Sequence, residues 1–181
     1  MNFRKTLSTA LLIGSLAVAG TAFAGISDVA WQNVDNKDAK VSLIVPAPWT
    51  VSVGGENIFT AANGDVNMAM TKSEKKISTE SLNRVMSSTR ERLLAEVKAD
   101  YMKKHPRARL MQCGFVEHPL RSEIRIIATV PEVEKDRHYQ MTSMFLVNHH
   151  WYKVESNYPM NDDSIFNVQC IQKAIKSLSF E

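Results

Sequence analysis

Alternation of apolar and polar residues runs through most of the chain and predicts β-strands. Successive side chains of a strand point to opposite faces, so this alternation is typical of strands that are buried on one face. The predicted strands cover residues 41–45, 49–53, 58–62, 66–70, 109–117, 123–130, 139–147 and 151–158. Between two of them, Asn63 and Gly64 predict a tight hairpin turn, because both residues tolerate a positive φ. The strand at 139–147 is apolar on both faces, which predicts a central position in the sheet.

Two other segments repeat their apolar residues at helical spacing. Residues 79–104 predict one long helix, which Ser78 caps at its start and Pro106 ends. Its apolar side comprises Leu82, Met86, Leu93, Val97 and Tyr101. Residues 162–177 predict a second helix, with Phe166 and Cys170 on its inward side. The order of strands, helix, strands and helix predicts an α+β fold, in which two main helices flank an antiparallel sheet of about six to eight strands.

The first 24 residues have the order of a cleavable secretory signal. Arg4 and Lys5 precede a short apolar stretch, and small residues at Ala22 and Ala24 mark the cleavage site. The apolar stretch is shorter than the about 20 residues that a membrane-spanning helix needs, and no later run reaches that length. We therefore expect cleavage after Ala24 and export to the periplasm or the exterior. We also expect a single domain over residues 25–181, without stable membrane insertion.

Loss of the signal changes how charge and cysteines are interpreted. Removal of Arg4 and Lys5 lowers the formal net charge from +3 to +1, so the mature chain offers no electrostatic case for binding nucleic acid. Cys113 and Cys170 would then lie in an oxidising compartment, where a pair of cysteines predicts a disulfide. The alternatives are two buried free thiols and one half of a metal site.

Candidate chemistry is sparse along the chain. The sequence has neither a Gly-x-Ser-x-Gly elbow nor a glycine-rich phosphate loop, and its five histidines show no metal-ligand spacing. We therefore predict a non-enzymatic protein with no catalytic residue, no cofactor and no metal ligand. Two alternatives stay open. Methionines such as Met68, Met70, Met141 and Met144 could bind copper, and a hydrolase could bring a nucleophile and a histidine together only in the fold.

Exposed aromatic residues are common anchors for protein partners. Trp151 and Tyr152 are neighbours in one predicted strand, so they point to opposite faces and one of them could face solvent. Trp49 follows the stiff corner Pro46-Ala47-Pro48. Trp49, Trp151 and Tyr152 are therefore the candidate partner surface.

The strand at 41–45 and its corner ending in Trp49 resemble the opening of the PsbP-like and DcrB-like families. The strand at 139–147, the Trp151-Tyr152-Lys153-Val154 strand and the closing Ser177-Leu178-Ser179-Phe180 are also similar. The resemblance implies an antiparallel sheet flanked by helices and a non-enzymatic role, because these families include photosystem accessory subunits, envelope proteins, toxin chaperones and secretion-associated immunity proteins. The chain departs from typical DcrB-like proteins because it lacks a lipobox cysteine. The leading hypothesis is an untethered exported domain that binds another protein, such as a secretion-associated adaptor or immunity protein.

Overall fold

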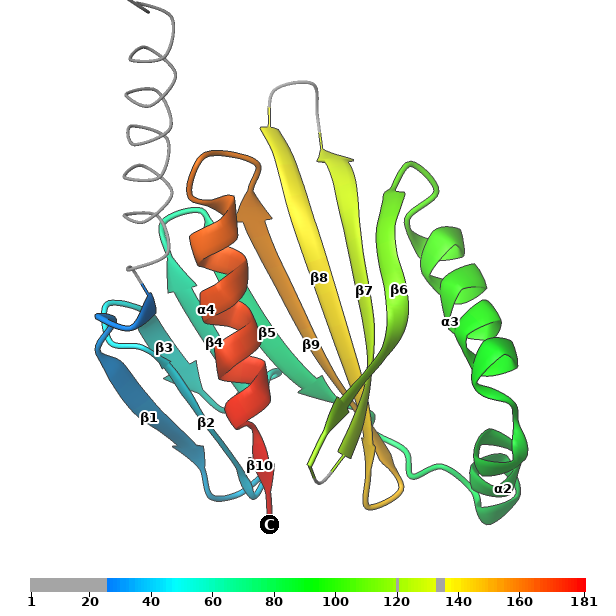
Figure 1. Ribbon diagram of the computed structural model, residues 1–181. Coiled ribbons are helices and arrows are strands. Elements are labelled where there is room, and N and C mark those ends of the chain that lie inside the picture. The colour runs from blue at the N-terminus through cyan, green and yellow to red at the C-terminus, as the bar shows by residue number, and fades with distance from the viewer. Residues whose placement is uncertain (1–25, 120, 133–135) are drawn as a thin grey trace, which may run out of the picture.

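The computed structural model describes residues 26–119, 121–132 and 136–181, with ten strands and three α-helices in these ranges (Figure 1). The first strands are β1 (Trp31–Asn36), β2 (Val41–Pro46), β3 (Thr50–Val53), β4 (Phe59–Asn63) and β5 (Val66–Lys72). Helices α2 (Thr79–Ser87) and α3 (Arg90–Lys104) follow. The chain continues through β6 (Arg109–His118), β7 (Arg121–Glu132), β8 (Asp136–Val147), β9 (His150–Pro159), α4 (Ser164–Ser177) and β10 (Ser179–Phe180).

The strands form two antiparallel sheets. The larger sheet has the order β3-β4-β5-β9-β8-β7-β6, and the smaller one has the order β1-β2-β10. Helix α4 lies across one face of the larger sheet, beside the smaller sheet (Figure 1). The α+β fold predicted from the sequence is therefore confirmed, as is the central position of the strand at 139–147, which lies between β7 and β9 as part of β8.

The main core lies between α4 and the two sheets. Met70, Phe145 and Ile171 are fully buried there, and so is Cys170 on the inward side of α4. The second predicted helix is confirmed, although α4 begins at Ser164, after Asp163. Phe166 does not join the core and keeps 38% of its surface exposed, so the first turn of α4 extends beyond the tightly packed part.

The prediction of one continuous helix over residues 79–104 is wrong. Ser88 has an extended backbone and ends α2, and its hydroxyl donates a hydrogen bond to the carbonyl of Arg84. Thr89 then caps α3 by accepting a hydrogen bond from the backbone N–H of Arg92. The side chains of Ser88 and Thr89 bind backbone groups on either side of the break, and these bonds compete with continuation of the helix. Here they outweigh the apolar repeat, which keeps its helical spacing across the break.

The predicted disulfide between Cys113 and Cys170 is also wrong, because both thiols are free. Cys113 pairs with Ile126 across β6 and β7, and both pack in a small cluster against α3. The next residue, Ile127, packs against the main core that holds Cys170. Since neighbouring residues of a strand point to opposite faces, the two cysteines lie on opposite sides of the larger sheet, where no bridge can join them.

Candidate functional site

The three aromatic residues predicted as a partner surface do not form one. Trp49 and Tyr152 are each only 5% exposed and belong to the main core. The Tyr152 ring meets the ring of Phe180 edge-on, with their centroids 4.8 Å apart. Trp151 is half-buried and lies on the other face of β9. The prediction is corrected accordingly, because the corner after β2 and the α4 face of β9 both turn their aromatic residues inward.

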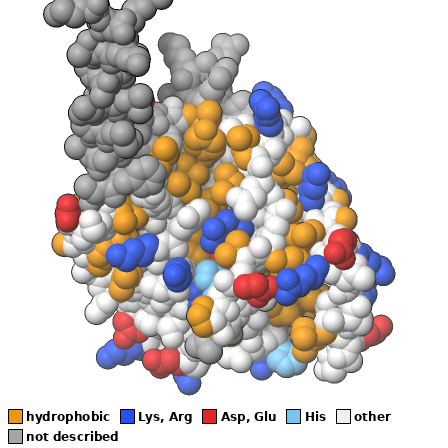
Figure 2. Space-filling view, viewed as in Figure 1, with side chains coloured by type: hydrophobic (Ala, Val, Ile, Leu, Met, Phe, Trp, Pro, Cys, Tyr) orange, Lys and Arg blue, Asp and Glu red, His pale blue; other side chains and the backbone are white. Residues whose placement is uncertain are grey.

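Exposed apolar side chains gather elsewhere, at the start of α4 and on β6. Met111 is 56% exposed, Met160 is 37% exposed and Ile165 is 64% exposed, and Phe166 adds a fourth. Figure 2 shows apolar side chains gathered on the face that carries α4, with basic side chains among them. An exposed apolar surface of this kind is a common mark of a protein-binding site.

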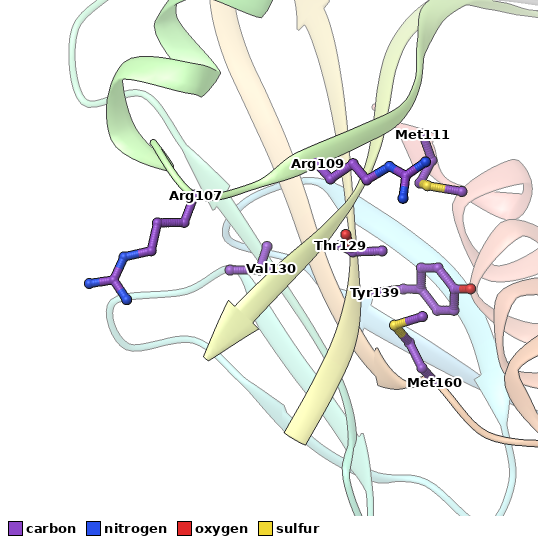
Figure 3. A pocket seen from close by; sticks show the side chains of 7 residues that line it. All are labelled: Arg107, Arg109, Met111, Thr129, Val130, Tyr139 and Met160. Carbon is purple, nitrogen blue, oxygen red and sulfur yellow. The ribbon is translucent and has the colours of Figure 1, made fainter. Parts of the chain in front are cut away.

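A groove of about 380 Å³ joins the two parts of this surface. It is lined by Arg107, Arg109, Met111, Thr129, Val130, Tyr139 and Met160, and we call it the Met111 groove. Figure 3 shows Tyr139 and Met160 across the groove from Met111, Arg109 beside Met111, and Arg107 extending outward at the rim. The groove therefore combines thioether and aromatic contact surface with two guanidinium groups.

Local irregularities of the backbone keep this groove open. The pairing of β6 with β7 shifts between Leu110 and Gln112, so Met111 is the extra residue of a β-bulge. Strand β6 is also an edge of the larger sheet, which leaves Met111 without a neighbouring strand on its outer side. Met160 lies in the short connection between β9 and α4. The bulge at Met111 and the connection at Met160 therefore leave both side chains exposed outside the core.

The segment between α3 and β6 supplies the positive charge. Residues 103–109 include Lys103, Lys104, Arg107 and Arg109 and no acidic residue. Ala108 is 8% exposed and packs beneath α3, so Arg107 and Arg109 on either side of it are directed to solvent. Within residues 26–119, 121–132 and 136–181, neither guanidinium forms an ion pair that would neutralise it.

A buried polar cluster lies on the same face of the sheet, closer to the C-terminal end of α4. The Glu123 carboxylate is fully buried and accepts hydrogen bonds from Arg125 at 2.6 and 2.8 Å and from Ser143 at 2.6 Å. His118 Nε2 lies 2.6 Å from the same carboxylate. Arg121 donates to the carbonyls of Ile175 and Leu178 and so joins this cluster to the end of α4.

Electrostatics hold Glu123 in its ionised form. Burial raises the pKa of the carboxyl group, but the hydrogen bonds from Arg125 and Ser143 and the positive charge of Arg125 outweigh it, so the pKa lies below its usual value. Ser143 therefore donates to a carboxylate, and no contact joins its hydroxyl to the His118 ring. This arrangement stabilises a buried charge and does not activate the serine as a nucleophile.

Three of the four methionines considered for copper binding are buried, and the fourth, Met144, is half-buried. Met68, Met70 and Met141 are each at most 1% exposed and pack in the main core. Within the described ranges, no three His, Cys, Asp or Glu side chains come together in a way that could hold a metal ion. The thioethers of Met68, Met70 and Met141 therefore fill the core.

A smaller cavity of about 140 Å³ lies beneath α3, between that helix and the back of the larger sheet. Ion-paired Lys153 and Glu155 contribute to its wall, as does Asp100 of α3. Thr142 also lines it, and the buried Thr142 hydroxyl has no hydrogen-bond partner among the described residues. The cavity has room for a small polar molecule.

The architecture places this chain in a known fold class. An antiparallel sheet with a closing helix on one face, a small second sheet and a further helix on the other face is the PsbP-like arrangement. The fold implied by the resemblance of the sequence is therefore confirmed.

Comparison with known proteins supports the fold and nothing narrower. No family model and no curated sequence matches the chain. The solution structure of cyanobacterial PsbP from Synechocystis sp. PCC 6803 has a TM-score of 0.60 and 9% identity, covering 87% of this chain and 96% of the other. The structure of LpqN, involved in cell envelope biogenesis of Mycobacterium tuberculosis, has a TM-score of 0.54 and 9% sequence identity. The match covers 84% of this chain and 91% of LpqN. The Ran-binding protein Mog1p of Saccharomyces cerevisiae has a TM-score of 0.53 and 8% sequence identity. The match covers 84% of this chain and 96% of Mog1p.

Proposed function

We propose that this protein is an exported, non-enzymatic domain that binds another protein through the Met111 groove and the adjoining start of α4. The observation that carries the proposal is the exposure of Met111 and Met160, which line the groove, together with the exposure of Ile165 and Phe166 in the first turn of α4. Protein partners commonly bury such apolar side chains at the centre of an interface. The buried cluster around Glu123 supports a non-enzymatic role, because its polar groups are already occupied by one another.

One of the similar structures supports a binding role by analogy, and another supports a place in the cell envelope. Mog1p is a Ran-binding protein, and LpqN is involved in cell envelope biogenesis. One fold class hosts many functions, so the analogy supports the kind of role and leaves the partner to the site itself. A secretion-associated adaptor or immunity protein fits both the expected export and the open groove.

Export rests on the signal sequence that ends at Ala24. Within residues 26–119, 121–132 and 136–181, no helix has the length and apolarity needed to cross a membrane. Intact-mass measurement of the protein from a periplasmic fraction is expected to give a chain that begins at Gly25. A full-length chain retained in the cytoplasmic fraction would contradict the proposed export.

Affinity capture from an envelope extract tests the binding site. The wild-type chain is expected to retain a specific protein that Met111→Ser and Ile165→Ser both release, because each change removes an exposed apolar contact. Met86→Ser is the matched control, since Met86 is 75% exposed on α2, away from the groove. If all three variants retain the same proteins as the wild type, the Met111 groove is not the binding surface.

Binding of a small ligand is a second candidate function, and the cavity beneath α3 is the observation that favours it. The unpartnered Thr142 hydroxyl and the charged groups of both signs on the wall suit a small polar molecule. Native mass spectrometry of protein isolated from its host is expected to show an added mass from a bound ligand. The Thr142→Val variant is expected to carry this ligand in a smaller fraction of its molecules. An unmodified mass for the gently isolated wild-type protein would contradict this candidate.

A further inference from the structure

We infer that the partner segment in the Met111 groove is acidic as well as apolar; this inference rests on the proposed function. The groove presents two chemistries side by side, and a purely apolar segment would satisfy one of them. Met111, Met160 and Tyr139 offer an apolar contact surface. Arg107 and Arg109 offer guanidinium groups that form strong, often bidentate hydrogen bonds with carboxylates.

The positive charge is local and built into the fold. Lys103 and Lys104 lie in the last turn of α3, where cations are favoured by the helix dipole. Arg107 and Arg109 do not share that explanation, because they follow the helix and flank the buried Ala108. Without Arg4 and Lys5 the chain carries 20 basic and 19 acidic residues, so residues 103–109, with four basic residues and no acidic one, stand apart from a nearly balanced chain.

A protein segment fits this site better than an anionic membrane surface. The Met111 groove is recessed between β6 and the connection that precedes α4, so its apolar lining can meet a narrow segment and cannot enter a bilayer as a protruding edge would. Asp162 and Asp163 lie two and three residues beyond Met160 and are exposed. Asp162 and Asp163 would repel a negatively charged membrane. A peptide, in contrast, can place its carboxylates only beside Arg107 and Arg109, away from these two aspartates.

Fluorescence anisotropy with defined peptides tests the inference on the full mature chain. One labelled peptide alternates glutamate with leucine, and its matched control has lysine in place of each glutamate. Wild-type protein is expected to bind the glutamate peptide, and the double change Arg107→Glu with Arg109→Glu is expected to weaken that binding by about tenfold or more while improving binding of the lysine peptide. Added salt is expected to reduce the preference for glutamate.

The control variant is Arg84→Glu, since Arg84 is exposed on α2 and outside the groove. It is expected to leave the affinity for the glutamate peptide unchanged, and thermal unfolding of each variant checks that it is folded. Equal binding of the two peptides by the wild type would overturn the inference. Binding to phosphatidylglycerol vesicles in preference to both peptides would also overturn it and identify a membrane surface.

The two proposals can fail separately. If Met111→Ser releases a captured protein but the glutamate peptide has no advantage over the lysine peptide, the inferred acidic chemistry is wrong and the proposed site stands. If Met111→Ser leaves capture unchanged, the proposed site is wrong whatever the peptides show.

Discussion

Replacement of Glu123 by glutamine removes a negative charge from a cluster that water does not reach. The wild-type carboxylate binds Arg125 through both of its oxygens, and Ser143 and His118 also contact it. Glutamine has nearly the same volume but carries an NH₂ group, which must face another hydrogen-bond donor. Arg125, which is only 8% exposed, then loses its counter-charge without gaining access to water.

The size of the effect follows from this burial. Removal of one partner from a buried ion pair leaves an uncompensated charge and destabilises proteins by about 3–5 kcal/mol. Glutamine keeps the packing and one acceptor oxygen, so we expect Glu123→Gln to lower the free energy of unfolding by about 3 kcal/mol near neutral pH. Glu117→Gln is the matched control. Its carboxylate binds Arg90 and Ser122 but lies at the surface, and we expect only a small change.

The loss should also depend on pH. The pKa of Glu123 lies below its usual value, because hydrogen bonds from Arg125 and Ser143 outweigh the opposing effect of burial. A carboxylate with a depressed pKa in the folded state contributes stability that is complete above its unfolded pKa of about 4.3 and is lost as pH falls through the folded pKa. In acid the wild-type protein loses the stability that the Glu123 carboxylate contributes, whereas the glutamine variant lacks this contribution at every pH. The difference between their free energies of unfolding should therefore become smaller as the pH falls.

Urea denaturation followed by tryptophan fluorescence measures both effects. The free energies of unfolding of the wild type, Glu123→Gln and Glu117→Gln are compared near pH 7 and again at about pH 3.5, below the unfolded pKa. A loss for Glu123→Gln no greater than that for Glu117→Gln would refute the argument from burial. An equal loss at both pH values would refute the argument from charge.

Three further predictions concern packing and backbone conformation. Thiol labelling without denaturant should modify half-buried Cys113 before fully buried Cys170, and a bridged peptide under non-reducing conditions would contradict the observed free thiols. Gly64→Ala should lower the free energy of unfolding by about 1 kcal/mol because Gly64 has a φ of 57°, whereas Gly114→Ala, in open space without such a φ, should have little effect; equal losses in urea titrations would contradict this. Ile171→Ala should cost about 3 kcal/mol in the same assay by opening a cavity in the main core, and a loss below about 1 kcal/mol would show that α4 repacks around it.

Local sequence pattern was sufficient for eight of the ten described strands, because their side-chain period is fixed by backbone geometry, and it missed β1 and β10. Residues 151–158 alternate, and β9 buries every second residue over this stretch. The predicted hairpin is present, but its turn lies at Gly64 and Asp65. Asn63 is the last residue of β4 and pairs with Val66, and only Gly64 has the positive φ that the prediction gave to both residues. Neither prediction needed knowledge of what lies on the other side of the sheet.

The two wrong structural predictions have different causes. The break between α2 and α3 had a local signal, because Ser88 and Thr89 are good cap residues, but the apolar repeat outweighed it in the sequence interpretation. The disulfide had no local signal that could correct it. Whether Cys113 faces α4 or α3 depends on the pairing of β6 with β7, and a shift of one residue would place the thiol on the other face.

The functional groups were missed for the same non-local reason. Glu123 and Arg125 alternate with Ile124 and Ile126, which in isolation indicates a polar face turned to solvent, yet the fold buries both charged residues. Met111 follows Leu110 in a strand and gives no sign that a bulge turns it outward. Both sites therefore depend on register and on the placement of α4.

The buried Glu123 cluster and the Met111 groove differ in what they could still offer to a partner. At Glu123 the charges face one another, the carboxylate is saturated with donors, and a ligand would have to displace hydrogen bonds that the fold needs. At the Met111 groove the chain leaves apolar surface and two guanidinium groups without a partner among the described residues. Binding free energy comes from groups that still gain by contact, which supports the proposal that a partner binds at the groove, whereas the hydrogen bonds of the buried cluster join the sheet to the end of α4.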